Sequence, residues 1–390
     1  MAGPLRGIRV LDLSTVIAGP YAGQILGDMG AEVIKVEPPQ GDIMRAAGPA
    51  RSPGMGAAFL NSNRNKSGLV LDLKEPDDLA RLLDLARSAD VLLINMRPAA
   101  ARRLGIAYED LAALNPRLVY CAIVGYGQDG PYRDRPAYDD IIQAATGWSG
   151  LEAQIGGTPR YAPTIVADKT TALYAVGAIN AALLHAARTG EGQYVEVPMF
   201  EVMASFLLVE HLGGRTFVPP EGPAGYARLL SRHRRPYPTK DGYLSVLPYT
   251  ATHWRRFFEL AGRDEWACDP RLADDAARAE IINELYERVA TCLPERTGAE
   301  WMALLPASDI PCSAVNSVDD LIADEHLAAV GFFVPAAHPT EGELLTVRCP
   351  VRFSGTPCEL RTGAPPLDAR ADSKDGTSAQ GYLASAGFAP

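Results

Sequence analysis

The sequence predicts an α/β protein in which a large, Rossmann-like, doubly wound domain is followed by a smaller α+β domain. Short apolar runs rich in β-branched residues alternate with helical patterns over about the first 130 residues, and this alternation favours parallel strands with helices on both faces. The first two runs flank one helical pattern and make a compact strand–helix–strand unit. The chain has 390 residues, 47% hydrophobic and 22% charged, which is typical of a soluble globular protein of two or three domains.

The expected elements follow in chain order. A strand at GIRVLDLS (7–14) leads through Ala18-Gly19-Pro20 into a helix at YAGQILGDMG, and AEVIKVE (31–37) forms the second strand. Further strands are expected at 67–74, 90–96 and 117–127, with a helix near 76–88. An apolar helix is predicted from Asp168 to about Thr189, followed by a strand at QYVEVPM and a helix at FEVMASFLLVEHL.

A change of composition divides the chain. The stretch 214–240 is rich in Pro, Gly and Arg and has no clear hydrophobic period. We therefore predict a large domain over 1–215, a linker over 216–240, a small α+β domain over 241–325 and a C-terminal segment over 326–390. In the last two parts we expect strands at GYLSVLPY and 343–353, and helices near 252–262, 274–291 and 297–305.

Charge and motifs exclude several classes of protein. The net charge of −10, with scattered basic residues, disfavours nucleic-acid binding. The start lacks the pattern of a signal peptide, and no stretch of about 18 apolar residues is evident, so we expect a cytoplasmic protein without membrane contact. The six cysteines form no CxxC and the six histidines no HExxH pair, so neither a metal site nor a disulfide framework is expected.

Two basic clusters are candidates for binding an anionic ligand. The first turn has one glycine, Gly19, where a dinucleotide-binding turn has GxGxxG, so TVIAGP is either a different ligand loop or an ordinary turn. Arg64 and Lys66 precede the strand at 67–74, and an arginine cluster follows the next strand at the same predicted edge, namely Arg97, Arg102 and Arg103. These cations suit a nucleotide phosphate, and the alternative is a pair of solvated loops.

Asp168 is the sharpest single candidate for catalysis. It follows YAPTIVA at the start of the long apolar helix, where unpaired N–H groups favour an ionised carboxylate. It is therefore either a helix cap or a nucleophile toward a thioester, and the two roles are compatible. The chain has no GxSxG elbow, P-loop or kinase signature.

Taken together, these segments resemble the family III CoA-transferases, which include formyl-CoA transferase and carnitine CoA-transferase and are related to alpha-methylacyl-CoA racemase. The resemblance spans nearly the whole chain. The segments that carry it, in order, are PLRGIRVLDLSTVIAGPYAGQILGDMGAEVIKVEPPQGD, NRNKSGLVLDLK, VLLINMRPAAARRLGI, NPRLVYCAIVGYGQDGPYRDRPAYDDIIQAATG, ADKTTALYAVGAINAALLHAARTGEGQYVEVPM and DIPCSAVNSVDDLIADEHL.

The resemblance implies an acyl-CoA:carboxylate CoA-transferase with Asp168 as nucleophile, an aspartyl anhydride and an aspartyl-CoA thioester. Coenzyme A and acyl-CoA are then substrates, and no permanently bound cofactor is expected. The implied fold is an interlocked homodimer whose C-terminal segment returns to the large domain. The residues that match the family's substrate and CoA site are Ile17, Ala18, Leu71, Asp72, Leu73, Lys74, Asn95, Met96, Arg97, Arg103, Pro136, Ala137, Tyr138 and Asp139.

The sequence departs from its relatives at three places. Ile17 stands where formyl-CoA transferase has a glutamine, and RLLSRHRRPYPTKDG replaces its glycine-rich loop, which disfavours formate and oxalate as substrates. The arginines of this loop, Arg232, Arg234 and Arg235, face either the carboxylate of a larger acid or solvent. Tyr138 stands where racemases have a histidine, so the acid/base pair that removes and returns an alpha proton is incomplete. A racemase, or an isomerase that transfers CoA within one molecule, is therefore the weaker, alternative function.

Overall fold

The computed structural model describes residues 3–367, which form two compact units. Unit 1 takes its described residues from the segments Met1–Gly147, Tyr161–Phe206 and His326–Pro390, and unit 2 takes its residues from Trp148–Arg160 and Leu207–Glu325. The expected C-terminal segment therefore lies outside the described residues from position 368 onward. The chain passes between the units four times.

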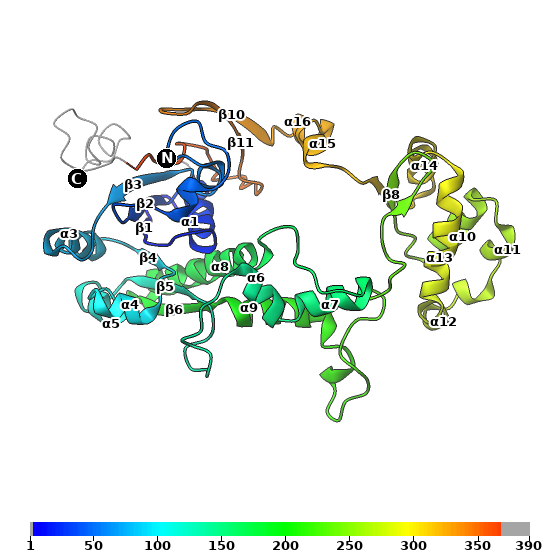
Figure 1. Cartoon of the computed structure of the whole chain (residues 1–390), viewed down its shortest axis with the longest axis horizontal. Helices are drawn as coiled ribbons and strands as arrows, with labels where there is room; N and C mark the ends of the chain where they lie inside the picture. Colours follow the sequence, from blue (N-terminus) through cyan, green and yellow to red (C-terminus); the bar gives the residue numbers. More distant parts are fainter. Residues whose placement is uncertain (1–2, 368–390) are drawn as a thin grey trace. The chain divides into compact units, whose positions relative to one another are not determined.

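A six-stranded parallel sheet forms the centre of unit 1, which confirms the expected mixed α/β fold (Figure 1). The strand order is β3-β2-β1-β4-β5-β6, so the direction of winding reverses between β1 and β4. At this reversal Leu11 pairs with both Ile34 and Leu92. The strands are β1 (Arg9–Asp12), β2 (Glu32–Glu37), β3 (Lys66–Val70), β4 (Val91–Ile94), β5 (Val119–Val124) and β6 (Gln193–Pro198).

Helices cover the sheet because its central strands are apolar on both faces. On one face Leu11, Leu92 and Tyr120 pack with Leu82 of α3 and Leu111 of α5. On the other, α1 packs against α8, which also contacts β5 and β6. The helices of unit 1 are α1 (Ala18–Asp28), α2 (Ala57–Leu60), α3 (Pro76–Arg87), α4 (Pro98–Arg103), α5 (Tyr108–Leu114), α6 (Asp139–Ala145) and α8 (Val166–Thr189).

Helix α8 is long and apolar enough, by length and composition alone, to cross a membrane. The sequence-based expectation that no such stretch exists was therefore wrong. Its buried residues, among them Ala172, Val176 and Ile179, lie on the side that packs in the core of unit 1. The apolar composition thus has an explanation in packing, because a core helix needs the same residues.

The described C-terminal segment packs on unit 1 beside α1. A hairpin of β10 (Phe333–His338) and β11 (Gly342–Val347) precedes it. The Arg361 guanidinium donates to the carbonyls of Gly27 and Ala31 at 2.9 and 2.8 Å, and the Asn65 N–H donates to the Thr362 carbonyl at 2.9 Å. These bonds connect residues about 300 positions apart in sequence, which local patterns do not reveal.

Unit 2 has its own core around a three-stranded antiparallel sheet of β7 (Tyr237–Pro238), β8 (Tyr243–Val246) and β9 (Cys312–Ala314). Trp254, Phe257 and Trp301 are buried in this core. Helix α9 (Met199–His211) begins in unit 1 and ends in unit 2, and α16 (Glu325–Ala329) spans the return. The other helices are α7 (Trp148–Gly156), α10 (Ala251–Leu260), α11 (Asp264–Ala267), α12 (Asp275–Glu280), α13 (Ile282–Cys292), α14 (Gly298–Leu304) and α15 (Val318–Ile322).

Candidate active site

A groove runs along the carboxyl ends of the parallel strands in unit 1, where ligands of open α/β sheets bind. Its larger part is a cavity of about 470 Å³ that reaches from the turn after β1 to Asp168. Its smaller part, about 230 Å³, lies over the segment after β3. The two parts share Thr15, Asn95 and Met96.

The groove brings together most of the substrate-site residues that the resemblance implies. The larger cavity is lined by Ala18, Asn95, Met96, Arg97, Arg103, Pro136, Ala137, Tyr138 and Asp168. The smaller cavity is lined by Leu71, Asp72, Leu73, Lys74, Asn95 and Met96. Two implied residues line neither cavity: Ile17 is buried beneath the turn, and Asp139 is buried beside Asp168.

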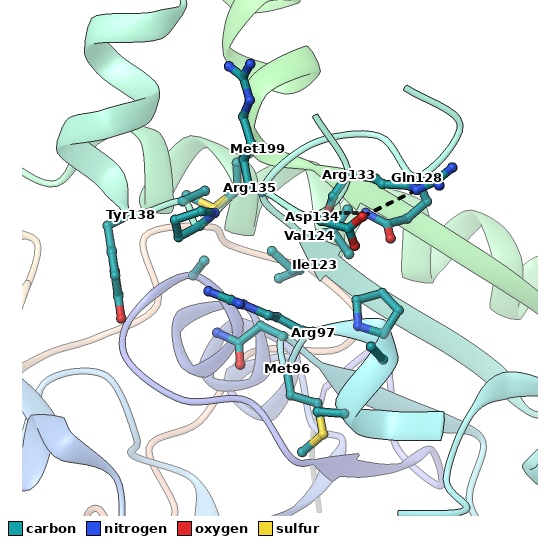
Figure 2. A pocket seen from close by; sticks show the side chains of 18 of the residues that line it. Met96, Arg97, Ile123, Val124, Gln128, Arg133, Asp134, Arg135, Tyr138 and Met199 are labelled. Carbon is teal, nitrogen blue, oxygen red and sulfur yellow. Dashed lines mark hydrogen bonds and ion pairs between the residues drawn. The ribbon is translucent and has the colours of Figure 1, made fainter. Parts of the chain in front are cut away.

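Arginines give the larger cavity its positive charge. Arg97 follows β4 and its side chain extends into the pocket, as Figure 2 shows. Arg102 and Arg103 lie in the last turn of α4, where cations interact favourably with the helix dipole. Arg133 and Arg135 come from the loop before α6. This set suits the phosphates of a nucleotide ligand.

The loop before α6 differs in character from the strand ends. Arg135 stacks on Tyr132 with its guanidinium carbon 3.6 Å from the ring centroid and points away from Arg97 in Figure 2. Arg133 pairs with Asp134 at 3.6 Å, and both are exposed. Tyr138, at the end of this loop, is 66% exposed. This wall therefore presents solvent-exposed side chains to a ligand in the cavity.

Asp168 lies in the first turn of α8, which begins at Val166 and not at Asp168 as expected. The Asp168 N–H donates to Oδ1 of Asp139 at 2.9 Å, and Gln143 donates to Oδ2 of Asp139 at 2.5 Å. Oε1 of Gln143 accepts the N–H of Ala162 at 2.8 Å. The Asp139 carboxylate of α6 therefore accepts the hydrogen bond from the N–H at this end of α8. The Asp168 carboxylate is not needed to cap the helix and is available to react with a substrate.

Burial first, and then the charge of Asp139, raises the pKa of Asp168 to about 7. This corrects the expectation that the helix start holds the carboxylate ionised. Only 8% of Asp168 is exposed, so water stabilises its charge poorly, and a second acid lies beside it. A carboxylate with a raised pKa is more basic and a better nucleophile than an ordinary one.

Arg64 and Lys66 have a structural role, so both expectations for this segment, an anionic-ligand site and a solvated loop, were wrong for these two cations. Arg64 pairs with Asp28 at 2.6 Å and Lys66 with Asp12 at 2.8 Å, and all four side chains are buried. Because the partners lie 36 and 54 positions away, nothing in the local sequence indicated them. The cations are already neutralised and do not line the groove.

Other residues of the cavity were not among those singled out from the sequence. They include Gln128, Arg133, Arg135 and Met199. All of them directly follow a strand or belong to the loop that leads to α6, so position at the sheet edge was the signal available. The loop arginines Arg232, Arg234 and Arg235 belong to unit 2, and Arg232 donates to His233, which lies 3.0 Å from Glu287.

Comparisons with known proteins identify the family of this chain. The sequence profile of CoA-transferase family III matches residues 5–371. The chain is 35% identical over 371 residues to the succinate–glutarate CoA-transferase of Agrobacterium fabrum, with 93% of each chain covered. It is 32% identical over 397 residues to the formyl-CoA:oxalate CoA-transferase of Streptomyces avermitilis, covering 94% of this chain and 93% of that protein. A solved CAIB/BAIF family structure from Brucella suis superposes with a TM-score of 0.81 at 31% identity, covering 94% and 97% of the chains.

Proposed function

Because this chain belongs to CoA-transferase family III and is an acyl-CoA:carboxylate CoA-transferase, we propose that it works through covalent intermediates on Asp168. The observation that carries the proposal is the Asp168 carboxylate itself. It lies at the wall of the larger cavity, it is 8% exposed, and its pKa is raised to about 7. A desolvated carboxylate of this kind is suited to attack a thioester carbonyl.

The reaction runs in two matched halves. One Asp168 oxygen attacks the thioester carbonyl of the donor, the C–S bond breaks, and an aspartyl acyl anhydride and CoA thiolate form. The thiolate then attacks the carboxyl carbon of Asp168 in this anhydride. The donor acid leaves as its carboxylate, and an aspartyl-CoA thioester remains on the enzyme. The acceptor carboxylate then displaces the thiolate to give a new anhydride, and the thiolate attacks its acyl carbonyl to release acyl-CoA and Asp168. No net proton is consumed.

The charged groove supports a site for CoA in which the thioester end lies toward Asp168. We assign the residues around Arg97 and Arg103 to the phosphates, because guanidinium groups bind phosphate through paired hydrogen bonds. The smaller cavity, lined by Leu71, Leu73 and Met96, offers apolar surface to the adenine ring. Tyr138 and the turn at Ala18 then flank the acyl group.

The acceptor that we propose is a dicarboxylic acid. Succinate and glutarate, which the name of the Agrobacterium fabrum relative contains, are both dicarboxylic acids. In this chain Arg133 and Arg135, on the exposed wall of the cavity, are available to bind a second carboxylate. A screen of succinyl-, acetyl- and aryl-CoA donors against dicarboxylic and monocarboxylic acids tests this assignment.

Asp168→Asn is the direct test of the covalent mechanism. The amide keeps the shape of the side chain, so the variant should fold but retain less than about one hundredth of wild-type turnover. Hydroxylamine should convert Asp168 of the wild type to a hydroxamate only when acyl-CoA is present, as mass spectrometry would detect. Asp140→Asn, an exposed neighbour in α6, is the matched control and should stay active. Greater residual turnover of Asp168→Asn, with deamidation excluded by mass, would rule the mechanism out.

The alternative function is racemisation of a 2-methylacyl-CoA. It needs a group that removes and returns the alpha proton, and Tyr138 stands where racemases have the histidine of this acid/base pair. Incubation of the enzyme with such a thioester in deuterated buffer separates the two. Exchange of the alpha proton without an acceptor acid would favour the racemase.

We also propose the interlocked homodimer that the resemblance implies. Two features support it: the chain crosses four times between the units, and α8 exposes apolar side chains at Leu173, Tyr174 and Leu184. An exposed apolar face on a long helix is typical of a subunit interface. Sedimentation at high dilution should find dimer only, and a folded monomer in simple equilibrium with dimer would contradict the interlock.

A further inference from the structure

The turn between β1 and α1 has an unusual backbone at Val16. Its φ is 70°, in the left-handed region that β-branched residues rarely adopt. Such a conformation persists only where surrounding contacts enforce it. Val16 also lines the larger cavity, together with Thr15 and Ala18 of the same turn. The contacts that enforce the conformation therefore bear on the shape of the active site.

Asp42 makes the contact that fixes Val16. The Val16 N–H lies 3.2 Å from both carboxylate oxygens of Asp42, and Oδ1 also accepts the N–H of Met44 at 3.0 Å. Lys35 donates to Oδ2 of Asp42 at 3.1 Å and to the Ser14 carbonyl at 2.7 Å. The side chains of Asp42 and Lys35 are fully buried, and neither lines the cavity.

The rest of the turn is fixed on either side of Val16. The Thr15 N–H donates to the side chain of Asn95 at 2.9 Å, and the Asn95 amide donates back to the Thr15 carbonyl at 2.7 Å. Gly19 packs against Ser14 so closely that an added Cβ would lie 2.1 Å from the Cβ of Ser14. Lys35 and Asp42 come from β2 and the segment that follows it, and Asn95 follows β4, so residues from two other parts of the chain hold the turn in addition to its own Gly19–Ser14 contact.

We propose that Asp42, anchored by Lys35, is a positioning residue that keeps Val16 in its left-handed conformation so that the turn is ready to receive the acyl end of acyl-CoA. The proposal rests on the assignment of the substrate to this cavity. A turn that is already in place does not have to be ordered when substrate binds, and the affinity for acyl-CoA is correspondingly higher. Without Asp42, Val16 returns to negative φ and the wall of the cavity changes shape.

Asp42→Asn tests the role because the amide cannot replace the carboxylate. The two oxygens of Asp42 serve three donors, namely the Val16 N–H, the Met44 N–H and the Lys35 ammonium. Asparagine has one acceptor oxygen, and its NH₂ would face either the ammonium or an N–H. We expect KM for acyl-CoA to rise about tenfold while kcat falls less, because the chemistry on Asp168 is untouched.

Val16→Gly separates positioning from stability. Glycine adopts positive φ without strain, so it should improve kcat/KM in the Asp42→Asn background. In the wild-type background, where Val16 is already fixed and packs in the cavity, the same change should lower kcat/KM by about two- to threefold. This reversal of sign is what positioning predicts. The same sign in both backgrounds, or an unchanged KM in Asp42→Asn, would overturn the proposal.

Asp28→Asn is the matched control. It breaks another buried ion pair of unit 1, with Arg64, but does not touch the turn. It should lower the thermal midpoint of unfolding and leave KM for acyl-CoA unchanged. A KM raised as much as in Asp42→Asn would show that loss of stability alone produces the effect.

If Asp42→Asn does not fold, hydrogen exchange of the Val16 amide in the free wild type is the test. The Val16 N–H should be protected, and exchange at the rate of an unfolded chain would overturn the proposal.

These outcomes separate this proposal from the mechanism on Asp168. If Asp168→Asn is inactive and Asp42→Asn has a normal KM, only the positioning role is wrong. If Asp168→Asn remains active, the covalent mechanism is wrong, and a sign reversal for Val16→Gly would still support positioning in the acyl-CoA site.

Discussion

Asp12 and Asp168 are both buried carboxylates of unit 1, one at the end of β1 and the other at the start of α8, and their surroundings shift their pKa values in opposite directions. Burial alone would raise the pKa of Asp12, but Lys66 and Lys35, with hydrogen bonds from Lys66 and Ser14, hold it below its usual value. Burial and the charge of Asp139 both raise the pKa of Asp168, which reaches about 7. The same side chain is therefore a fixed charge in one region and a titrating group in the other.

The different surroundings of the two carboxylates show which buried acid is available for chemistry. Asp12 is engaged by Lys66 at 2.8 Å and by the Ser14 N–H at 3.0 Å, so its lone pairs are occupied and its charge is offset. Asp168 has no such cation among the causes that shift its pKa, and it faces the cavity. Perturbed acids of this second kind gather at functional sites.

The largest effect is expected from breaking the Asp12 site. Asp12→Asn leaves the ammonium of Lys66 buried without its carboxylate, and loss of one partner of a buried pair typically costs about 3–5 kcal/mol. Urea unfolding of the variant should show this loss. Adding Lys66→Met to the same variant should recover much of the stability, because the ammonium that had lost its carboxylate is then removed. A loss below about 1 kcal/mol in Asp12→Asn would mean that the pair contributes like an exposed one.

The second effect is the pH dependence of catalysis. Asp168 must be ionised to attack, so kcat/KM should fall about tenfold per pH unit below the pKa of about 7. In Asp139→Asn the neighbouring charge is gone, the pKa of Asp168 falls, and the acid limb should move to lower pH. The asparagine oxygen can still accept the Asp168 N–H, so the helix start is preserved. An acid limb of kcat/KM at the same pH as in the wild type would show that the charge of Asp139 does not raise the pKa of Asp168.

Much of the fold followed from the sequence because parallel strands are marked by apolar β-branched runs. VLLI of β4 and VYCAIV of β5 are buried throughout, and both were expected as strands. Among the elements that were not expected, α6 and α7 follow a loop rich in Pro and Arg and are short. Short helices carry little periodicity of their own and are stabilised by tertiary packing.

The sequence predicted the reactive residue of the site but not the residues that surround and position it. Asp168 was singled out by its place before an apolar helix, whereas the role of Asp139 depends on a contact 29 positions away. Arg64 and Lys66 looked like ligand residues because a sequence does not show which cations are already paired. The left-handed Val16 had no signal at all, since a valine gives no warning of positive φ.

The smallest expected effect is the change in stability on replacing Asp168, and its sign at high pH is opposite to that at Asp12. The pKa of Asp168 is raised on folding, so the folded state binds its proton more tightly than the unfolded chain does. This difference in proton binding favours the folded state at low pH, and the advantage is lost as the pH rises through about 7. Asp168→Asn, which is neutral throughout, should therefore be more stable than the wild type at pH ~8 by about 1–2 kcal/mol, with a smaller gap at pH ~5. Asp12→Asn should be less stable than the wild type at both. Unfolding curves of the two variants at both pH values decide it: if Asp168→Asn is destabilised like Asp12→Asn, then Asp168 has a stabilising partner, and its carboxylate is a structural charge like that of Asp12.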